Sequence, residues 1–152
     1  MRQLDLYLTA VTDKGLEHLR GLPIERLDMT GTAVGDTGLE QLGRLPLAIL
    51  VLRETKVTSA GLRALRDLPL RHLDLSHTAV TDGGLVHLKG LRELRTLDLS
   101  DTPIGDAGLS ELSKIPDLAT VYLVGTNVTP AGLAGFKSAR PEVRVYADRP
   151  VR

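Results

Sequence analysis

Short runs of alternating apolar and polar residues recur along the chain at a nearly fixed distance. The run "LDLSH" at 73–77 is one of six that share this pattern. Alternation with a period of two is typical of a half-buried β-strand, because successive side chains point to opposite faces. The pattern predicts strands near residues 4–8, 27–31, 50–54, 73–77, 97–101 and 121–125. A partial seventh run, "VRVYA", predicts a C-terminal capping strand near 143–147.

Each predicted strand is followed by a stretch whose leucines have the spacing of a short helix, as in "TAVTDGGLVHL" (78–88). Thr81 is expected to cap this helix, with Asp82 in its first turn, where negative charge suits the helix dipole. Pro130 behind Thr129 supports the same register in the last unit. Gly-Leu pairs recur every 23 or 24 residues, beginning at Gly15, Gly38, Gly61, Gly84, Gly108 and Gly132. We interpret Gly84 as a point where helix and strand approach closely.

A unit of this size cannot bury its own apolar face, whereas units stacked side by side share one continuous core. Stacking places a parallel sheet on one side of the core and helices on the other. The chain is therefore predicted to be an α/β solenoid. Residues 1–152 are expected to form a single domain of about six repeats of 23–24 residues.

The motif L-x-x-L-x-L-x-x-T-x-V, as in "LRHLDLSHTAV" (70–80), resembles the leucine-rich repeat. The pattern "TDxGLxxLxxL" that follows it resembles bacterial members of the ribonuclease-inhibitor-like superfamily. This resemblance implies a right-handed horseshoe with the sheet on the concave side and short helices on the convex side. It also implies a protein-binding scaffold that uses the concave face.

Threonine stands where many leucine-rich repeats carry asparagine or cysteine. We expect these hydroxyls to bond backbone groups in the turns of neighbouring units. The column consists of Thr9, Thr32, Thr55, Thr78, Thr102 and Thr126.

Two groups of outward-facing residues depart from the repeat pattern on the expected concave face. In the third repeat Ile49 and Val51 form an apolar spot, and near the C-terminus two tyrosines lie beside a valine. Exposed tyrosine with arginine nearby is typical of interface hot spots. The predicted protein-binding residues are Arg26, Ile49, Val51, Arg53, His72, Tyr122, Val124 and Tyr146. The alternative is that single surface apolar residues carry no function and that strand propensity alone explains them. The regular aspartates of the "LDL" runs are interpreted as a solubilising pattern.

Composition narrows the class of partner. Nineteen basic residues balance nineteen acidic ones, so the sequence offers neither the basic surface that binds nucleic acid nor an electrostatic membrane anchor. The chain has no cysteine, which excludes disulfides and thiolate metal sites and fits a reducing compartment. The N-terminus lacks the apolar stretch of a signal peptide. We therefore expect a cytoplasmic protein whose partner is another protein, not identified by the sequence.

His72, Asp74 and Ser76 share one strand face and suggest a catalytic triad. Successive residues on one face are about 6.6 Å apart, which is too far for a hydrogen-bonded relay. The histidines and aspartates show no close ligand spacing that indicates a metal. We accordingly predict no enzyme activity, no catalytic residue, no metal site and no cofactor.

The start of the array suggests a second possible role. The repeat pattern begins in mid-unit and shows no N-terminal cap, so the edge residues Leu4, Leu6, Val11, Leu16 and Leu19 are expected to face water. The alternative function is a structural or assembly module, or a truncated or designed repeat fragment, that self-associates through this uncapped N-terminal edge.

Overall fold

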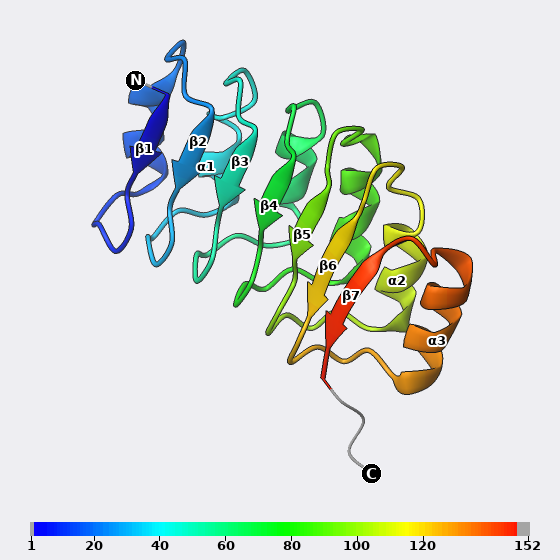
Figure 1. Ribbon diagram of the computed structural model, residues 1–152. Coiled ribbons are helices and arrows are strands. Elements are labelled where there is room, and N and C mark those ends of the chain that lie inside the picture. Colours follow the sequence, from blue (N-terminus) through cyan, green and yellow to red (C-terminus); the bar gives the residue numbers. More distant parts are fainter. Residues whose placement is uncertain (1, 149–152) are drawn as a thin grey trace.

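Seven short strands alternate with six short helices in the computed structural model, which describes residues 2–148 (Figure 1). The strands are β1 (Gln3–Asp5), β2 (Arg26–Asp28), β3 (Ile49–Val51), β4 (His72–Asp74), β5 (Thr96–Asp98), β6 (Thr120–Leu123) and β7 (Arg144–Ala147). The α-helices are α1 (Asp36–Leu39), α2 (Asp106–Leu112) and α3 (Pro130–Ala139). The 3-10 helices are η1 (Asp13–Leu19), η2 (Gly61–Leu65) and η3 (Asp82–Gly90).

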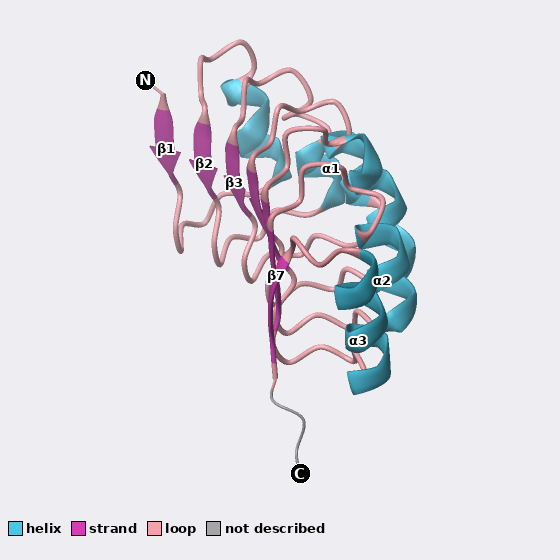
Figure 2. Cartoon of the chain, turned by 45° about the vertical axis from the view of Figure 1, so that its right-hand side comes forward, coloured by secondary structure: helices cyan, strands magenta, loops and turns pink. Residues whose placement is uncertain are grey.

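All seven strands are parallel and lie in one sheet in their order along the chain. Leu50 of β3 is in register with Leu27 of β2 and with Leu73 of β4, so one strand step equals one repeat. The helices cover one face of this sheet and the strands line the opposite, concave face (Figure 2). The predicted right-handed α/β solenoid is confirmed.

Most strands begin one residue earlier than the alternation predicts, and they are shorter. An aspartate turn ends several of them: Asp28 Oδ1 accepts the backbone N–H of Thr30 at 3.0 Å and its hydroxyl at 2.7 Å. Asp5, Asp74 and Asp98 accept the N–H two residues later in the same way, at 2.8–2.9 Å. Such Asx turns divert the backbone from the extended conformation. The "LDL" aspartates are thus turn-forming residues rather than a solubilising pattern. We call them the turn aspartates.

The core is a single aliphatic cluster that runs along the stack between sheet and helices. Leu27, Leu50 and Leu73 from the strands and Leu62 and Leu85 from the helices have no exposed surface. Burial of each such side chain stabilises the fold by roughly 1.5–3 kcal/mol. Because each leucine contacts residues of adjacent units, the units stabilise one another rather than folding singly.

The N-terminal edge differs from the expectation. Leu16 is fully buried and Leu19 is 9 % exposed, because η1 packs against α1 of the next unit. Leu4, Leu6 and Val11 are only half-buried. The prediction that all five residues face water was therefore wrong for the two helical leucines.

The threonine column bonds within its own unit rather than between units. Thr32, Thr55 and Thr78 donate their hydroxyls to the carbonyl oxygen three residues earlier, at 2.6–2.8 Å. These three threonines are at most 8 % exposed, so the bonds satisfy hydroxyls that water does not reach. The expected link to neighbouring units was wrong.

The link between neighbouring units comes from the acidic residue at each helix start. Asp36 Oδ1 accepts the N–H of Thr58, 22 residues later, at 2.8 Å, and its Oδ2 accepts the Thr58 hydroxyl at 2.6 Å. Asp13, Asp82 and Asp106 make the same contact with the backbone N–H of the following unit, at 2.7–2.8 Å. We call these four residues the inter-unit aspartates.

Ser59 takes the place of the inter-unit aspartate in the third repeat. Its hydroxyl oxygen accepts the N–H of Thr81 at 2.9 Å. Thr81 is the N-cap residue of η3, as predicted, but its side chain makes no capping bond and its hydroxyl lies 3.0 Å from that of Ser59. Thr129 does cap its helix, accepting the N–H of Gly132 at 3.1 Å with Pro130 in the first turn, as predicted.

The repeated glycine is explained by the same junction. A Cβ on Gly84 would lie 2.8 Å from both Cβ and Oγ of Ser59 and 2.9 Å from its Cα. The glycine therefore accommodates the helix start of the preceding unit, and the interpretation as a close approach of helix and strand was wrong. At Gly38, Gly61, Gly108 and Gly132 the nearest atom is an oxygen of an inter-unit aspartate.

Gly84→Ala should lower the free energy of unfolding by roughly 1–3 kcal/mol, because the added methyl group overlaps backbone and side-chain atoms of Ser59. The adjacent Gly83→Ala is the matched control, since no heavy atom lies within 4 Å of a Cβ there. Removing glycine flexibility at Gly83 should leave stability unchanged or raise it by about 0.5–1 kcal/mol. Urea denaturation measures both. Equal effects of the two substitutions would contradict the proposed role of the junction.

Asp106→Asn tests an inter-unit aspartate through pH. Hydrogen bonds from the Thr129 hydroxyl and then from its N–H hold the pKa of the Asp106 carboxyl below its ordinary value. The charged form therefore stabilises the folded chain above the ordinary carboxyl pKa, and this contribution is lost as the pH falls through the lowered folded-state pKa. The variant should be less stable than wild type near neutral pH, and the difference should shrink on acidification.

Urea denaturation between about pH 7 and about pH 3 measures this difference across the carboxyl range. Asp117→Asn is the control, because Asp117 is exposed and makes no hydrogen bond with the rest of residues 2–148. If the difference in free energy of unfolding between wild type and Asp106→Asn instead grew at low pH, the charged Asp106 carboxylate would not stabilise the fold as proposed.

Candidate protein-binding surface

The concave face brings the first group of predicted residues together. Arg26, Ile49 and His72 are register partners on β2, β3 and β4. Val51 lies on β3 and Arg53 two residues beyond it. We call these five residues the Val51 patch. Ile49 and Val51 are half-buried and Arg26 is exposed, so the patch is an apolar centre with a basic border.

Arg53 is the residue of this patch whose side chain makes two polar contacts. Its guanidinium pairs with Glu54 at 3.1 Å and donates to Ser76 Oγ at 3.4 Å. The pairing offsets the charge of the guanidinium locally.

The second predicted group forms an aromatic surface on the last two strands. Tyr122 and Tyr146 are register partners on β6 and β7, and their rings stack with centroids 4.8 Å apart and planes 11° apart. Tyr146 is 49 % exposed and the neighbouring Val124 is 42 % exposed. We call these three residues the tyrosine patch. Stacking fixes both rings before any partner arrives, so little side-chain entropy is lost on binding.

Both patches lie where a turn aspartate is replaced. Val51 and Tyr122 occupy the column in which β1, β2, β4 and β5 carry aspartate. The backbone N–H groups of Arg53 and Val124 consequently have no acceptor among residues 2–148, whereas Thr30 and Ser76 bond to a carboxylate. Each patch thus combines exposed apolar surface with an open backbone donor. Comparing the repeats reveals the missing aspartates, but the open donors become visible only in the structure.

Of the three residues that suggested a triad, Asp74 and Ser76 form a turn and His72 lies on β4. Ser76 is fully buried, and its hydroxyl donates to Asp74 Oδ1 at 2.6 Å. No hydrogen bond joins His72 to either residue. Within residues 2–148 no three histidine or acidic side chains are grouped so as to hold a metal ion. None of the described helices has the length and apolar character to cross a membrane.

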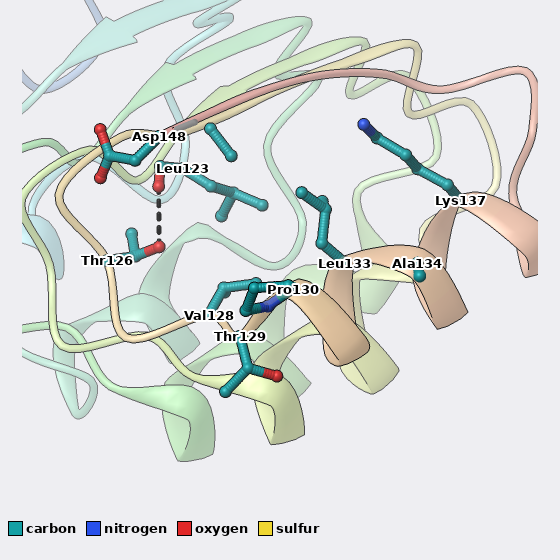
Figure 3. Close-up of a pocket in the computed structure, with 10 residues that line it drawn as sticks. Leu123, Thr126, Val128, Thr129, Pro130, Leu133, Ala134, Lys137 and Asp148 are labelled. Carbon is teal, nitrogen blue, oxygen red and sulfur yellow. Dashed lines mark hydrogen bonds between the residues drawn. The ribbon is translucent and has the colours of Figure 1, made fainter. Parts of the chain in front are cut away.

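A cavity of about 420 Å³ lies at the C-terminal end of the stack, between α3 and the ends of β6 and β7 (Figure 3). Its apolar lining includes Leu123, Val128 and Leu133, with Lys137 and Asp148 at its border. Leu133 is half-buried, although the equivalent leucines of the preceding five units are at most 3 % exposed. The cavity therefore occupies the place that a following unit fills elsewhere in the stack. No departure from the repeat pattern marks this cavity in the sequence, because its lining repeats the ordinary core positions.

The architecture is that of a leucine-rich-repeat solenoid. The family described as "Leucine Rich repeat" matches residues 23–43, 68–88 and 91–113. The matched segments cover three of the repeats and less than half of the chain. No curated protein sequence matches the chain.

Two solved structures from Listeria monocytogenes have a similar fold. An internalin (inlF) superposes with a TM-score of 0.73 at 20 % identity over 97 % of this chain and 41 % of its own. Internalin C2 superposes with a TM-score of 0.58, also at 20 % identity, over 97 % of this chain and 80 % of its own. The chain thus spans less than half of the first internalin.

Substitutions at Val51 and Asp74, which occupy the same column of the sheet, test whether the turn aspartates stabilise the turns that follow the strands. Asp74→Val removes the acceptor of a buried hydroxyl and should lower the free energy of unfolding by about 1–3 kcal/mol. Val51→Asn supplies an acceptor for the Arg53 N–H, and this gain of about 1 kcal/mol should offset the lower strand propensity of asparagine. Urea denaturation should therefore show a near-neutral Val51→Asn and a destabilised Asp74→Val. The reverse ranking would refute the assignment.

Proposed function

We propose that the chain is a protein-binding scaffold whose partner contacts the Val51 and tyrosine patches of the concave face. The observation that supports this is the replacement of a turn aspartate by an apolar or aromatic residue at both patches. Each replacement gives up a turn hydrogen bond and leaves an apolar side chain partly open to solvent. Leucine-rich repeats typically serve as scaffolds for protein interactions, which supports the same use here.

In this proposal the scaffold has no catalytic residue, and its partner is another protein. Rigid tyrosines and border arginines favour binding to a protein, because they offer large contact areas at low entropic cost. The cytoplasmic location expected from the cysteine-free sequence stays a prediction.

Self-association through the N-terminal edge is the second candidate. Tyr7 is 57 % exposed and Leu8 is 62 % exposed beside the outer edge of β1, where Leu4 and Leu6 are half-buried. This apolar surface favours contact with a further chain or a further domain. It lies on β1 and the turn after it, away from both concave patches.

A capture experiment with immobilised protein separates the two candidates. Val51→Asp and Tyr122→Ala should each abolish retention of a concave-face partner, because one places a charge in the apolar centre and the other removes a stacked ring. Lys89→Ala on the helical side is the matched control and should bind as wild type does.

Light scattering over a dilution series reports self-association in the same variants. Association that persists in Val51→Asp and Tyr122→Ala would belong to the N-terminal edge. Unchanged capture by both variants would refute the proposed site.

A further inference from the structure

The two patches are separated by two turn aspartates that face the same side of the sheet. Asp74 of β4 and Asp98 of β5 are register partners, and they lie between Val51 of β3 and Tyr122 of β6. The order across the sheet is therefore apolar, acidic, acidic and aromatic. A partner that lies across the strands meets these residues in that order.

The charge of this acidic pair is not neutralised within residues 2–148. Asp74 and Asp98 each use Oδ1 for their turn, and neither takes part in an ion pair with a described residue. Two residues in the turns after β3 and β4 have other acidic partners: Arg53 lies 3.1 Å from Glu54, and His77 lies 3.1 Å from Asp101. A ligand that approaches the centre of this face therefore meets negative charge.

The spacing of these residues matches an extended chain. Three strand steps of about 4.8 Å place the two patches about 14 Å apart. Residues i and i+4 of an extended peptide are about 13.4 Å apart and point to the same side, with residue i+2 midway between them. A peptide that places residue i on Val51 and residue i+4 on Tyr122 thus places residue i+2 over the gap between Asp74 and Asp98.

We propose that the concave face binds an extended segment of a partner protein that carries an apolar residue, a basic residue two positions later and an apolar or aromatic residue two positions after that. This inference rests on the proposed function and specifies its partner. The charge complementarity of the central residue selects the segment, and the two apolar residues anchor its ends. The open N–H groups of Arg53 and Val124 lie beside the anchors and are available to main-chain carbonyl oxygens of the segment.

The probe is the blocked peptide acetyl-Gly-Ser-Leu-Ser-Lys-Ser-Leu-Ser-Gly-amide, titrated into the isotope-labelled chain and followed by amide chemical shifts. The amide signals of Arg53 and Val124 should move with saturation. Replacing the central lysine by glutamate should weaken binding at least about tenfold, because repulsion replaces attraction. A peptide of identical composition with both leucines moved next to the lysine should also bind at least about tenfold more weakly, because its anchors no longer reach both patches.

Variants of the chain test the acidic pair without disturbing the turns. The double substitution Asp74→Asn and Asp98→Asn retains an acceptor for each turn N–H and removes both charges. It should weaken binding of the lysine peptide about fivefold or more and abolish the preference for lysine over glutamate. Asp5→Asn lies in the same column on β1 and is the matched control, which should leave the affinity unchanged.

The outcomes separate this inference from the function on which it rests. If lysine and glutamate peptides bind equally, or if the double variant binds as wild type does, the basic-segment proposal is overturned. Capture of a partner that depends on Val51 and Tyr122 would then leave the scaffold function in place. If neither capture nor peptide binding depends on those two residues, both proposals are overturned.

Discussion

A single type of contact organises the stack: the acidic residue at one helix start binds the backbone of the next unit. Asp36 and its equivalents supply a carboxylate that accepts N–H groups 22 or 23 residues later. This contact requires a residue without Cβ where the next helix passes, which accounts for the repeated glycine. It also fixes the distance between helices on the convex side, while the ladder of strand hydrogen bonds fixes it on the concave side. The leucine core fills the space that these two sets of contacts define.

A second set of aspartates has a different task on the opposite face. Asp28, Asp74 and their equivalents end the strands by turning the backbone towards the helix side. Where the column changes to Val51 or Tyr122, the turn loses its acceptor and the face gains apolar surface. At this position of the repeat, the aspartate that stabilises the turn and the apolar residue that the proposed partner contacts exclude each other. The concave face can vary there because the inter-unit aspartates and the core maintain the stack independently.

Much of the fold follows from the period of the sequence alone. The strand columns, the order of the sheet and the buried face of each helix depend on residue spacing, and the spacing of the leucines predicts them. The contacts of polar side chains depend on distances between units, which the period does not provide. For this reason the predicted partner of Thr78 was in the wrong unit, and the predicted neighbour of Gly84 was wrong. The candidate patches depart from the repeat pattern and could be selected for that reason, whereas Asp74 and Asp98 conform to it and were interpreted as a solubilising pattern.

Ser59 makes one junction between units different from the four that an inter-unit aspartate forms. In a solenoid the cohesion of the whole is close to a sum over adjacent pairs, so one weak junction affects cooperativity more than its share of contacts suggests. A neutral hydroxyl is a weaker acceptor than a carboxylate, and here it joins the third and fourth units. The polar link at the junction between β3 and β4 is therefore weaker than those made by the inter-unit aspartates, although the sheet and the core continue across it. Val51 lies before this junction and the tyrosine patch after it, so a partner that contacts both would also bridge the junction.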